Sequence, residues 1–252
     1  MNMTNTALLN IATDPIWVDS ATELNALCET WQQQGAVAID TEFMRTSTFY
    51  PIAALFQVSD GNGCYLIDPL VIDDFSGFKA LLTNPSVVKV LHACSEDLEV
   101  FQTFLGVLPS PLFDTQWAAA CAGYDFSMGY ARLIDETLSV TVAKSETRSD
   151  WLQRPLSESQ LRYAALDVAY LLIAYGLLLK KLKADVRLAW VEDECAQQVA
   201  VAAAGSDFSK AYVKVKNAWK LSAQELGVLQ ALALWREQAA RERDVPRNRL
   251  AK

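Results

Sequence analysis

The chain has 252 residues, 52% of them hydrophobic, and a mean hydropathy of +0.10, which exclude a disordered chain and allow one sizeable core with a smaller appendage. Its net charge of −8 by itself argues against a nucleic-acid partner, because polyanion binding draws on basic surface. That average is uneven, however: residues 205–252 carry about +5 and residues 1–204 about −13.

Targeting and redox features predict a soluble, cytoplasmic protein. The longest uninterrupted apolar stretch, 168–179, is too short to cross a bilayer, and residues 1–10 lack the basic flank and apolar run of a signal peptide. The five cysteines are scattered and include no C-x-x-C pair, so neither a disulfide framework nor a zinc site is expected.

The pattern of hydrophobic residues predicts alternating strands and helices. In chain order, strands are expected over 16–19, 36–43, 55–59, 64–68, 87–93 and 111–115, and helices over 20–34, 95–106, 116–124, 128–139, 157–183, 191–205 and 221–243. The second to fourth strands form an antiparallel meander around the turn-rich residues 60–63, and the later strands add to it in parallel. The fold class is therefore α/β, a mixed sheet with flanking helices.

Three local signals mark helix starts and the domain boundary. Ser20 with Glu23, and Ser157 with Gln160, have capping-box spacing. Residues 140–155 are polar enough to form a connecting loop. We place a domain boundary at Gly205, with a separate helical element after it.

Two acidic residues close the expected strand 36–43. Asp40 and Glu42 are two apart, so their side chains emerge on one face while Thr41 points to the other. The residues before them are apolar, and like charges repel strongly in such surroundings unless a cation neutralises them. Oxygen ligands without a His or Cys cluster favour Mg²⁺ or Mn²⁺ over zinc. A lone Asp-x-Glu, however, is more often a strand end that reaches solvent.

A second acidic position opens the expected helix 95–106. Asp97 follows Ser95, a candidate N-cap, and an acidic residue is common at a helix start because it caps the helix and complements its dipole. Capping is likewise the default role of Asp114, which precedes the next helix.

A third position lies on the expected helix 157–183. Tyr163 and Asp167 are four residues apart and share one face, to the side of the apolar stripe. A Tyr beside an Asp on a half-buried helix is ordinary by itself, because the hydroxyl is often satisfied at a domain surface.

Taken together, these positions resemble the three exonuclease motifs of the ribonuclease D family, in the DEDD superfamily. Asp-Thr-Glu-Phe-Met-Arg at 40–45, running into Thr-Phe-Tyr-Pro at 48–51, is similar to the first motif. His-Ala-Cys-Ser-Glu-Asp-Leu-Glu at 92–99 is similar to the second, and Tyr-Ala-Ala-Leu-Asp at 163–167 to the third. Residues 144–151 resemble the loop before the third motif.

The resemblance implies a ribonuclease H-like catalytic domain over 1–205 and, over 206–252, a linker and the first helix of a helicase-and-ribonuclease-D C-terminal (HRDC) domain. Because that domain normally continues for several more helices, we expect residues 206–252 to be only its beginning.

The same resemblance implies a metal-dependent 3′-to-5′ exoribonuclease of the tyrosine subtype. Two divalent ions, Mg²⁺ or Mn²⁺, would be held by Asp40, Glu42, Asp97 and Asp167. Tyr163 would orient the attacking water, and nucleoside 5′-monophosphates would leave the 3′ ends of RNA. Precursors of tRNA are the substrates that the family suggests, for a chain expected to act as a monomer away from membranes.

The sequence identifies RNA-contacting residues less specifically than it identifies metal ligands. Arg45, Lys144 and Arg148 are candidates for backbone phosphates, and Phe49 and Tyr50 for stacking on terminal bases. Core packing and loop solvation explain the same residues equally well.

Three alternatives stay open or are set aside. A DNA-directed exonuclease uses the same metal chemistry, and a non-catalytic RNA-binding scaffold uses the same fold, although a decayed site is expected to lose its carboxylates first. The only histidine, His92, has the spacing to Asp97 by which related enzymes replace the tyrosine. It ends a strand instead of sharing a helix with Asp97, so local packing is the expected role.

Overall fold

The computed structural model describes residues 14–142, 146, 149–205 and 207–251, and its chain divides into two compact units. The first unit comprises Met1–Met44 and Ala53–Ala203, and the second comprises Arg45–Ile52 and Ala204–Lys252. The second unit thus includes an early segment of the chain, Arg45–Ile52, which the expected boundary at Gly205 assigns to the first domain.

The first unit is built on a mixed sheet, as the sequence predicts. Within the described residues it has six strands in the order β1-β4-β3-β2-β5-β6. Neighbours β3 and β4 are antiparallel, whereas β1 runs parallel to β4, β2 to β5 and β5 to β6. The strands are β1 Ile16–Val18, β2 Ala36–Met44, β3 Ile52–Ser59, β4 Cys64–Ile67, β5 Val88–Leu91 and β6 Leu112–Asp114.

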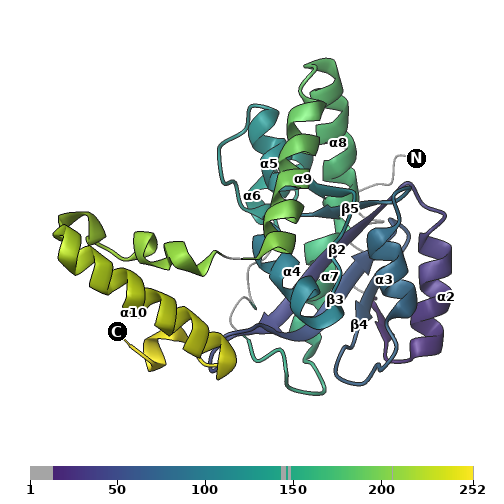
Figure 1. Cartoon of the computed structure of the whole chain (residues 1–252). Coiled ribbons are helices and arrows are strands. Elements are labelled where there is room, and N and C mark those ends of the chain that lie inside the picture. Colours follow the sequence, from purple (N-terminus) through teal and green to yellow (C-terminus); the bar gives the residue numbers. More distant parts are fainter. Residues whose placement is uncertain (1–13, 143–145, 147–148, 206, 252) are drawn as a thin grey trace. The chain divides into compact units, whose positions relative to one another are not determined.

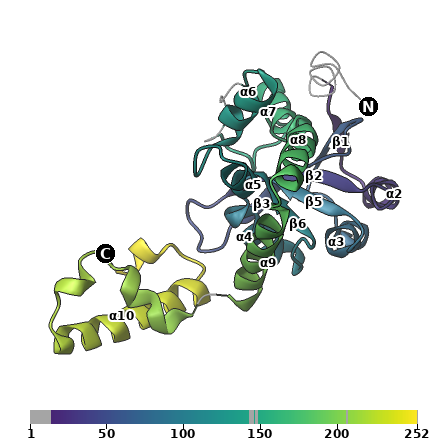
Figure 2. The same ribbon diagram turned by 90° about the horizontal axis from the view of Figure 1, so that it is seen from above.

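Helices cover both faces of this sheet. Both ribbon views place α2 and α3 together on one side and α7 and α8 on the other (Figures 1 and 2). Helix α7 contacts β2 and β4, and α8 contacts β2 and β5, so the two helices lie over the centre of the sheet. The helices of this unit are α2 Ala21–Trp31, α3 Ser76–Thr83, α4 Ser95–Val100, α5 Thr115–Cys121, α6 Tyr130–Leu138, α7 Glu158–Ala169, α8 Leu171–Ala184 and α9 Leu188–Ala204.

Helix α3 is absent from the sequence prediction. Its stretch contains Gly77, a poor helix former, and the reason for that glycine is tertiary. The backbone N–H of Gly77 donates to Asn25 Oδ1 of α2 at 3.1 Å, and a Cβ built on Gly77 would lie 2.4 Å from that oxygen. The glycine therefore lets α3 approach α2 closely.

Two expected helices are interrupted. The helix over 157–183 begins with the predicted capping box of Ser157 and Gln160, but it breaks at Tyr170 into α7 and α8. The apolar pattern runs through this break because both helices bury a face, so periodicity carries no sign of it. The helix over 95–106 continues after α4 as a π-helical turn, η1 (Phe101–Leu105), and ends at Gly106 with φ of 71°.

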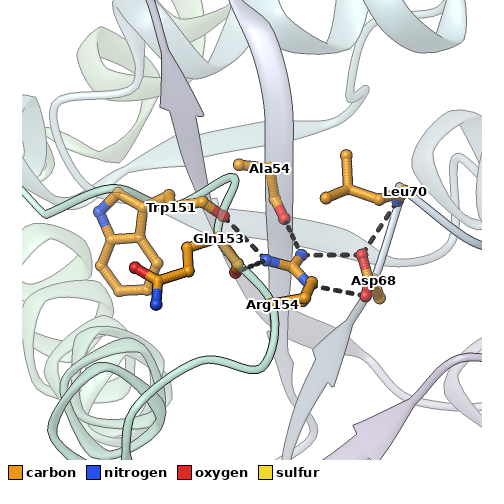
Figure 3. A network of polar contacts seen from close by, with 6 residues as sticks. All are labelled: Ala54, Asp68, Leu70, Trp151, Gln153 and Arg154. Atoms are coloured by element: carbon orange, nitrogen blue, oxygen red, sulfur yellow. Dashed lines mark hydrogen bonds and ion pairs between the residues drawn. The ribbon is translucent and has the colours of Figure 1, made fainter.

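An arginine anchors the segment that leads into α7 (Figure 3). Arg154 donates to both carboxylate oxygens of Asp68, at 2.7 and 2.8 Å, and to the carbonyl of Ala54 on β3 at 2.7 Å. It also donates to the carbonyls of Trp151 and Gln153. The fork geometry ties the chain before α7 to the sheet and fixes where α7 starts.

Among the described residues, one helical stretch, Glu158–Ala184, which comprises α7, Tyr170 and α8, is long and apolar enough to span a membrane when judged by length and composition alone. Half of its most apolar window is buried inside the protein. A core helix of a globular unit passes the same test, and the contacts of α7 and α8 with the sheet are those of a core helix.

The second unit is helical. Its long helix α10 spans Ala223–Glu242 and begins with a capping box formed by Ser222 and Glu225. In the described part of this unit, three 3₁₀ segments accompany it: η2 Phe208–Lys214, η3 Ala218–Lys220 and η4 Arg247–Arg249. Helix α10 packs against η2 and η4.

Candidate metal centre

Three carboxylates from two elements meet at the C-terminal half of β2. Asp40 and Glu42 leave β2 on the same face, as the period of a strand dictates, and α7 packs against β2 and brings Asp167 to them. One ligand oxygen from each residue lies within 4.8 Å of the other two. All three residues are partly buried, so solvent screens their charges only incompletely.

Burial and mutual repulsion raise the pKa of each carboxyl group. The pKa of Asp40 lies well above its usual value because of burial first and then the charges of Asp97, Asp167 and Glu42. Burial and the charges of Asp167 and Asp97 raise the pKa of Glu42 to about 9. Burial raises the pKa of Asp167 to about 7, against a hydrogen bond from Tyr163 that lowers it.

These features fit a divalent cation. The donor atoms are carboxylate oxygens, which hard cations such as Mg²⁺ and Mn²⁺ prefer. A cation among them would remove the repulsion that raises their pKa values and return the groups to the ionised form. The cluster could therefore hold a metal ion, as expected from the spacing of Asp40 and Glu42.

Asp97 lies close enough to this cluster for its charge to act on Asp40 and Glu42, and Thr41 of β2 holds it by a hydrogen bond. It is buried on α4, and Thr41 Oγ1 donates a 2.5 Å hydrogen bond to its Oδ1. Burial raises the pKa of Asp97 to about 6, while the bond from Thr41 lowers it. Asp97 is not one of the three residues whose oxygens lie within 4.8 Å of one another, but its charge contributes to the raised pKa of Asp40 and Glu42.

The turn before α4 is organised by a carboxylate from the neighbouring strand. Asp114 is buried and accepts hydrogen bonds from the backbone N–H groups of Ala93, at 2.9 Å, and Cys94, at 3.1 Å. Ala93 adopts a left-handed conformation with φ of 55°, which costs energy for a residue other than glycine. Asp114 thus stabilises the turn that leads to Asp97.

The capping predictions at these two helices have different outcomes. Asp114 caps α5 as predicted, because its side chain accepts from Gln116 N at 2.8 Å. The prediction that Ser95 caps α4 is wrong: Ser95 is the first helical residue, and the N-cap is Cys94, whose side chain makes no capping bond. Asp114 instead binds the N–H groups of this turn from outside the helix.

Tyr163 lies between the cluster and an aromatic side chain. Its hydroxyl forms a hydrogen bond with Asp167, and burial and the charges of Asp167, Glu42 and Asp40 raise its pKa. The ring of buried Trp151 lies 6.0 Å from that of Tyr163 between centroids. Trp151 belongs to the segment that Arg154 anchors, so the same tie supports Tyr163.

Two residues of the surroundings were missed in the sequence. For Thr41, strand alternation indicates only the direction of its side chain. Its hydrogen-bond partner Asp97 lies 56 residues away and cannot be identified from a local pattern. Tyr130 on α6 donates to the carbonyl of Leu166 at 2.6 Å, and burial and the charge of Asp167 raise its pKa. Nothing in the sequence marks Tyr130, because its partner Leu166 lies 36 residues further along the chain.

His92 packs locally, as its position at a strand end predicts. Its Nδ1 lies 2.9 Å from Thr115 Oγ1, and its ring makes an edge contact with Tyr130 at 5.8 Å. Burial lowers its pKa, so the imidazole is neutral at physiological pH.

Three of the five expected RNA-contacting residues lie within the described structure. Arg45, Phe49 and Tyr50 belong to the second unit, whereas Lys144 and Arg148 lie outside the described residues. Arg45 Nε donates to the carbonyl of Phe49 at 2.8 Å. Phe49 is only 4% exposed, so base stacking would require its ring to leave its present packing, whereas Tyr50 is 36% exposed.

Comparisons with known proteins agree with this arrangement. A family model described as 3′-5′ exonuclease matches residues 15–183. Ribonuclease D of Pseudomonas paraeruginosa is 51% identical over 232 residues, which are 92% of this chain and 61% of that protein. The chain thus spans under two thirds of that relative.

Solved structures extend the comparison. The crystal structure of Escherichia coli RNase D, an exoribonuclease involved in structured RNA processing, is similar with a TM-score of 0.86 and 44% identity, over 94% of this chain and 64% of that one. Brucella melitensis NrnC with bound Mg²⁺ is similar with a TM-score of 0.66 and 25% identity, over 81% of this chain and 96% of that one. Together with the match over residues 15–183, these similarities show that the chain belongs to the 3′-5′ exonuclease family and confirm its resemblance to ribonuclease D.

Proposed function

We propose that the protein is a metal-dependent 3′-to-5′ exoribonuclease that trims the 3′ ends of structured RNAs, including tRNA precursors, and releases nucleoside 5′-monophosphates. One observation carries the proposal: Asp40, Glu42 and Asp167, from two of the three motifs, bring their ligand oxygens within 4.8 Å of one another. The similarity to E. coli RNase D, an exoribonuclease involved in structured RNA processing, supports RNA as the substrate.

The proposed site uses four carboxylates to hold two divalent ions, Mg²⁺ or Mn²⁺. Asp40, Glu42 and Asp167 supply one cluster of ligands, and Asp97 supplies a fourth carboxylate from α4. When bound, such ions would lower the pKa of water at the site and would stabilise charge on the departing 3′ oxygen. The related B. melitensis NrnC with bound Mg²⁺ supports this choice of cofactor.

The chain's own residues position the reactants. Tyr163 orients the attacking water through its hydroxyl, and Asp167 and Trp151 hold Tyr163 in place. Thr41 fixes one oxygen of Asp97 and leaves the other for binding. Ordering these groups before the substrate arrives lowers the entropic cost of reaching the transition state.

Digestion of a structured RNA that carries a 3′ trailer tests the proposal. With Mg²⁺, we expect shortening from the 3′ end with release of nucleoside 5′-monophosphates, and with EDTA no shortening. The Asp40→Ala variant should lose cleavage while it keeps the circular-dichroism spectrum of the folded protein. Asp193→Ala, which removes an exposed acid from α9, is the matched control and should keep full activity.

The proposal fails if Asp40→Ala cleaves normally or if the products arise from the 5′ end. Competition between labelled RNA and DNA of the same sequence separates the exoribonuclease from a DNA-directed exonuclease, because the carboxylates by themselves do not distinguish the two sugars. Faster removal of nucleotides from the DNA end would favour the second activity.

A further inference from the structure

The second unit contains two basic cavities that share an arginine. The first cavity has a volume of about 510 Å³ and is lined by both parts of this unit, with Arg45, Arg247 and Arg249 as its charged residues. The second, of about 520 Å³, is lined by residues from 207–216, by α10 and by η4, with Lys210, Lys214, Lys216, Arg236 and Arg247 as its basic residues. Arg247 lines both cavities, so they adjoin.

A buried carboxylate fixes the shared arginine. Glu237 of α10 is 6% exposed and accepts hydrogen bonds from Arg247 and from Arg241, the latter at 2.6 Å. Despite burial, these two guanidinium groups lower the pKa of Glu237, so it is ionised at neutral pH. Two arginines neutralise its negative charge, so Glu237 does not repel an anion bound in the cavities.

The aromatic ring of Phe49 also supports the arginines. The guanidinium carbons of Arg241 and Arg247 lie 4.4 and 4.7 Å from the centroid of the Phe49 ring. Asp244 accepts hydrogen bonds from the backbone N–H groups of Phe49 and Tyr50, at 2.8 and 3.0 Å, and holds this segment against the end of α10. The buried Phe49 ring is thus a platform for arginines, which orders them before any ligand binds.

Two cationic groups at the cavities retain unused hydrogen-bonding capacity. Among the described residues, the side chain of Arg249 has no hydrogen-bond or ion-pair partner. The Nε atom of Arg236 is buried without a partner, a costly state that a bound acceptor would relieve. Both cavities therefore offer donors to an anion with several oxygen atoms.

The charge pattern favours a polyanion over a single small anion. The linings together contain seven basic residues and two acidic ones, Asp207 and Glu237. Asp207 pairs with Lys210 at 3.5 Å, and Glu237 is paired with arginines. A chain with a negative charge at each repeat matches adjoining cavities better than one phosphate ion does, because it can occupy both at once.

We propose that the two adjoining cavities bind the sugar–phosphate backbone of single-stranded RNA, with Arg249 and Lys214 as phosphate contacts on either side of Arg247. The choice of RNA rests on the proposed function, whereas the phosphate chemistry rests on the cavities themselves. Because the guanidinium and ammonium groups would bind phosphates and not base edges, this site contributes affinity without sequence preference.

Binding of a fluorescent single-stranded RNA to the 252-residue chain in EDTA tests this proposal without cleavage. Arg249→Ala and Lys214→Ala should each weaken binding roughly fivefold at about 0.1 M salt and reduce the slope of log K against log salt by about 0.7, the value for one phosphate contact on a single strand. Arg243→Ala and Lys220→Ala are matched controls, because both residues are exposed and line neither cavity.

The controls should keep wild-type affinity and slope. Equal losses in all four variants would overturn the proposal in favour of diffuse attraction to positive charge, and unchanged binding in Arg249→Ala and Lys214→Ala would overturn it outright. Unchanged thermal unfolding of each variant shows that folding is intact. If the protein binds RNA in this pattern but does not cleave it with Mg²⁺, the proposed function fails while this site stands.

Discussion

Thr41 Oγ1 donates a 2.5 Å hydrogen bond to Asp97 Oδ1, and this bond joins the first motif to the second. Thr41 lies between Asp40 and Glu42 on β2, so alternation turns its side chain away from the face that those carboxylates use. A single strand therefore supplies two candidate ligands and, from the residue between them, the support for Asp97.

The Thr41→Val variant tests this support. Valine keeps the shape of threonine but leaves the buried Asp97 without its hydroxyl partner, so we expect a loss of about 1–3 kcal/mol in unfolding free energy. Cleavage with Mg²⁺ should fall as well, because Asp97 loses its fixed orientation. Urea unfolding and initial rates measure the two effects. Thr41→Ser should retain both properties, and a valine variant equal to the wild type would contradict the role.

The carboxylate cluster should make stability depend on pH when divalent ions are absent. The folded-state pKa values of Asp97, Asp167 and Glu42 are raised to about 6, about 7 and about 9, above the values of an unfolded chain. The folded protein then holds protons that the unfolded chain releases, so stability is full at low pH and is lost as pH rises through these values. In EDTA, the melting temperature should fall between about pH 5 and about pH 9.

Addition of Mg²⁺ should reduce this fall, because a cation stabilises the ionised carboxylates of the folded state. The Asp40→Asn variant lacks one of the like charges, so its melting temperature in EDTA should fall less with rising pH even without Mg²⁺. Two results would contradict a metal-binding cluster. One is a melting temperature that rises over this pH range in EDTA, and the other is a melting temperature near the upper end of the range that Mg²⁺ does not change.

Sequence patterns predicted the features of the site that depend on neighbours along the chain. Strand alternation placed Asp40 and Glu42 on one face, and the capping box at Ser157 set the start of α7 and hence the shared face of Tyr163 and Asp167. Both inferences need only a local period, which tertiary contacts do not change.

Features that depend on contacts between distant segments could not be predicted from local sequence patterns. The bonds from the Phe49 segment to Asp244 join residues 195 positions apart, and they place the 45–52 segment in the second unit. The close approach of Gly77 to Asn25 explains α3, although glycine weakens the local helical signal. Each is fixed by a contact whose partner no local pattern identifies. That residues 206–252 begin an HRDC domain stays a prediction.

The pair formed by Arg154 and Asp68 should stabilise the segment before α7. Arg154→Ala would leave Asp68, only 2% exposed, without its bidentate partner, and breaking such a pair costs about 3 kcal/mol or more. Arg154→Lys keeps the charge but cannot form the same fork, so it should recover only part of this loss. Urea unfolding measures both variants.

A double-mutant cycle separates this pair from general packing. Asp68→Asn combined with Arg154→Ala should cost less than the sum of the single changes, because no unpaired charge remains buried. Additive effects would show that the two side chains act independently and would contradict their role as one anchor.

Tyr163, and not His92, should fill the variable position of the site. Tyr163→Phe removes the hydroxyl that bonds Asp167 but keeps the ring against Trp151, so folding and metal affinity should be retained while turnover falls at least about tenfold. His92→Gln should keep most of the activity, because the partly buried His92 side chain bonds Thr115 and lies at a strand end instead of on α7. Single-turnover rates with saturating Mg²⁺, together with Mg²⁺ titrations by melting temperature, distinguish these outcomes. A phenylalanine variant with wild-type turnover, or a glutamine variant that is inactive yet folded, would reverse the assignment.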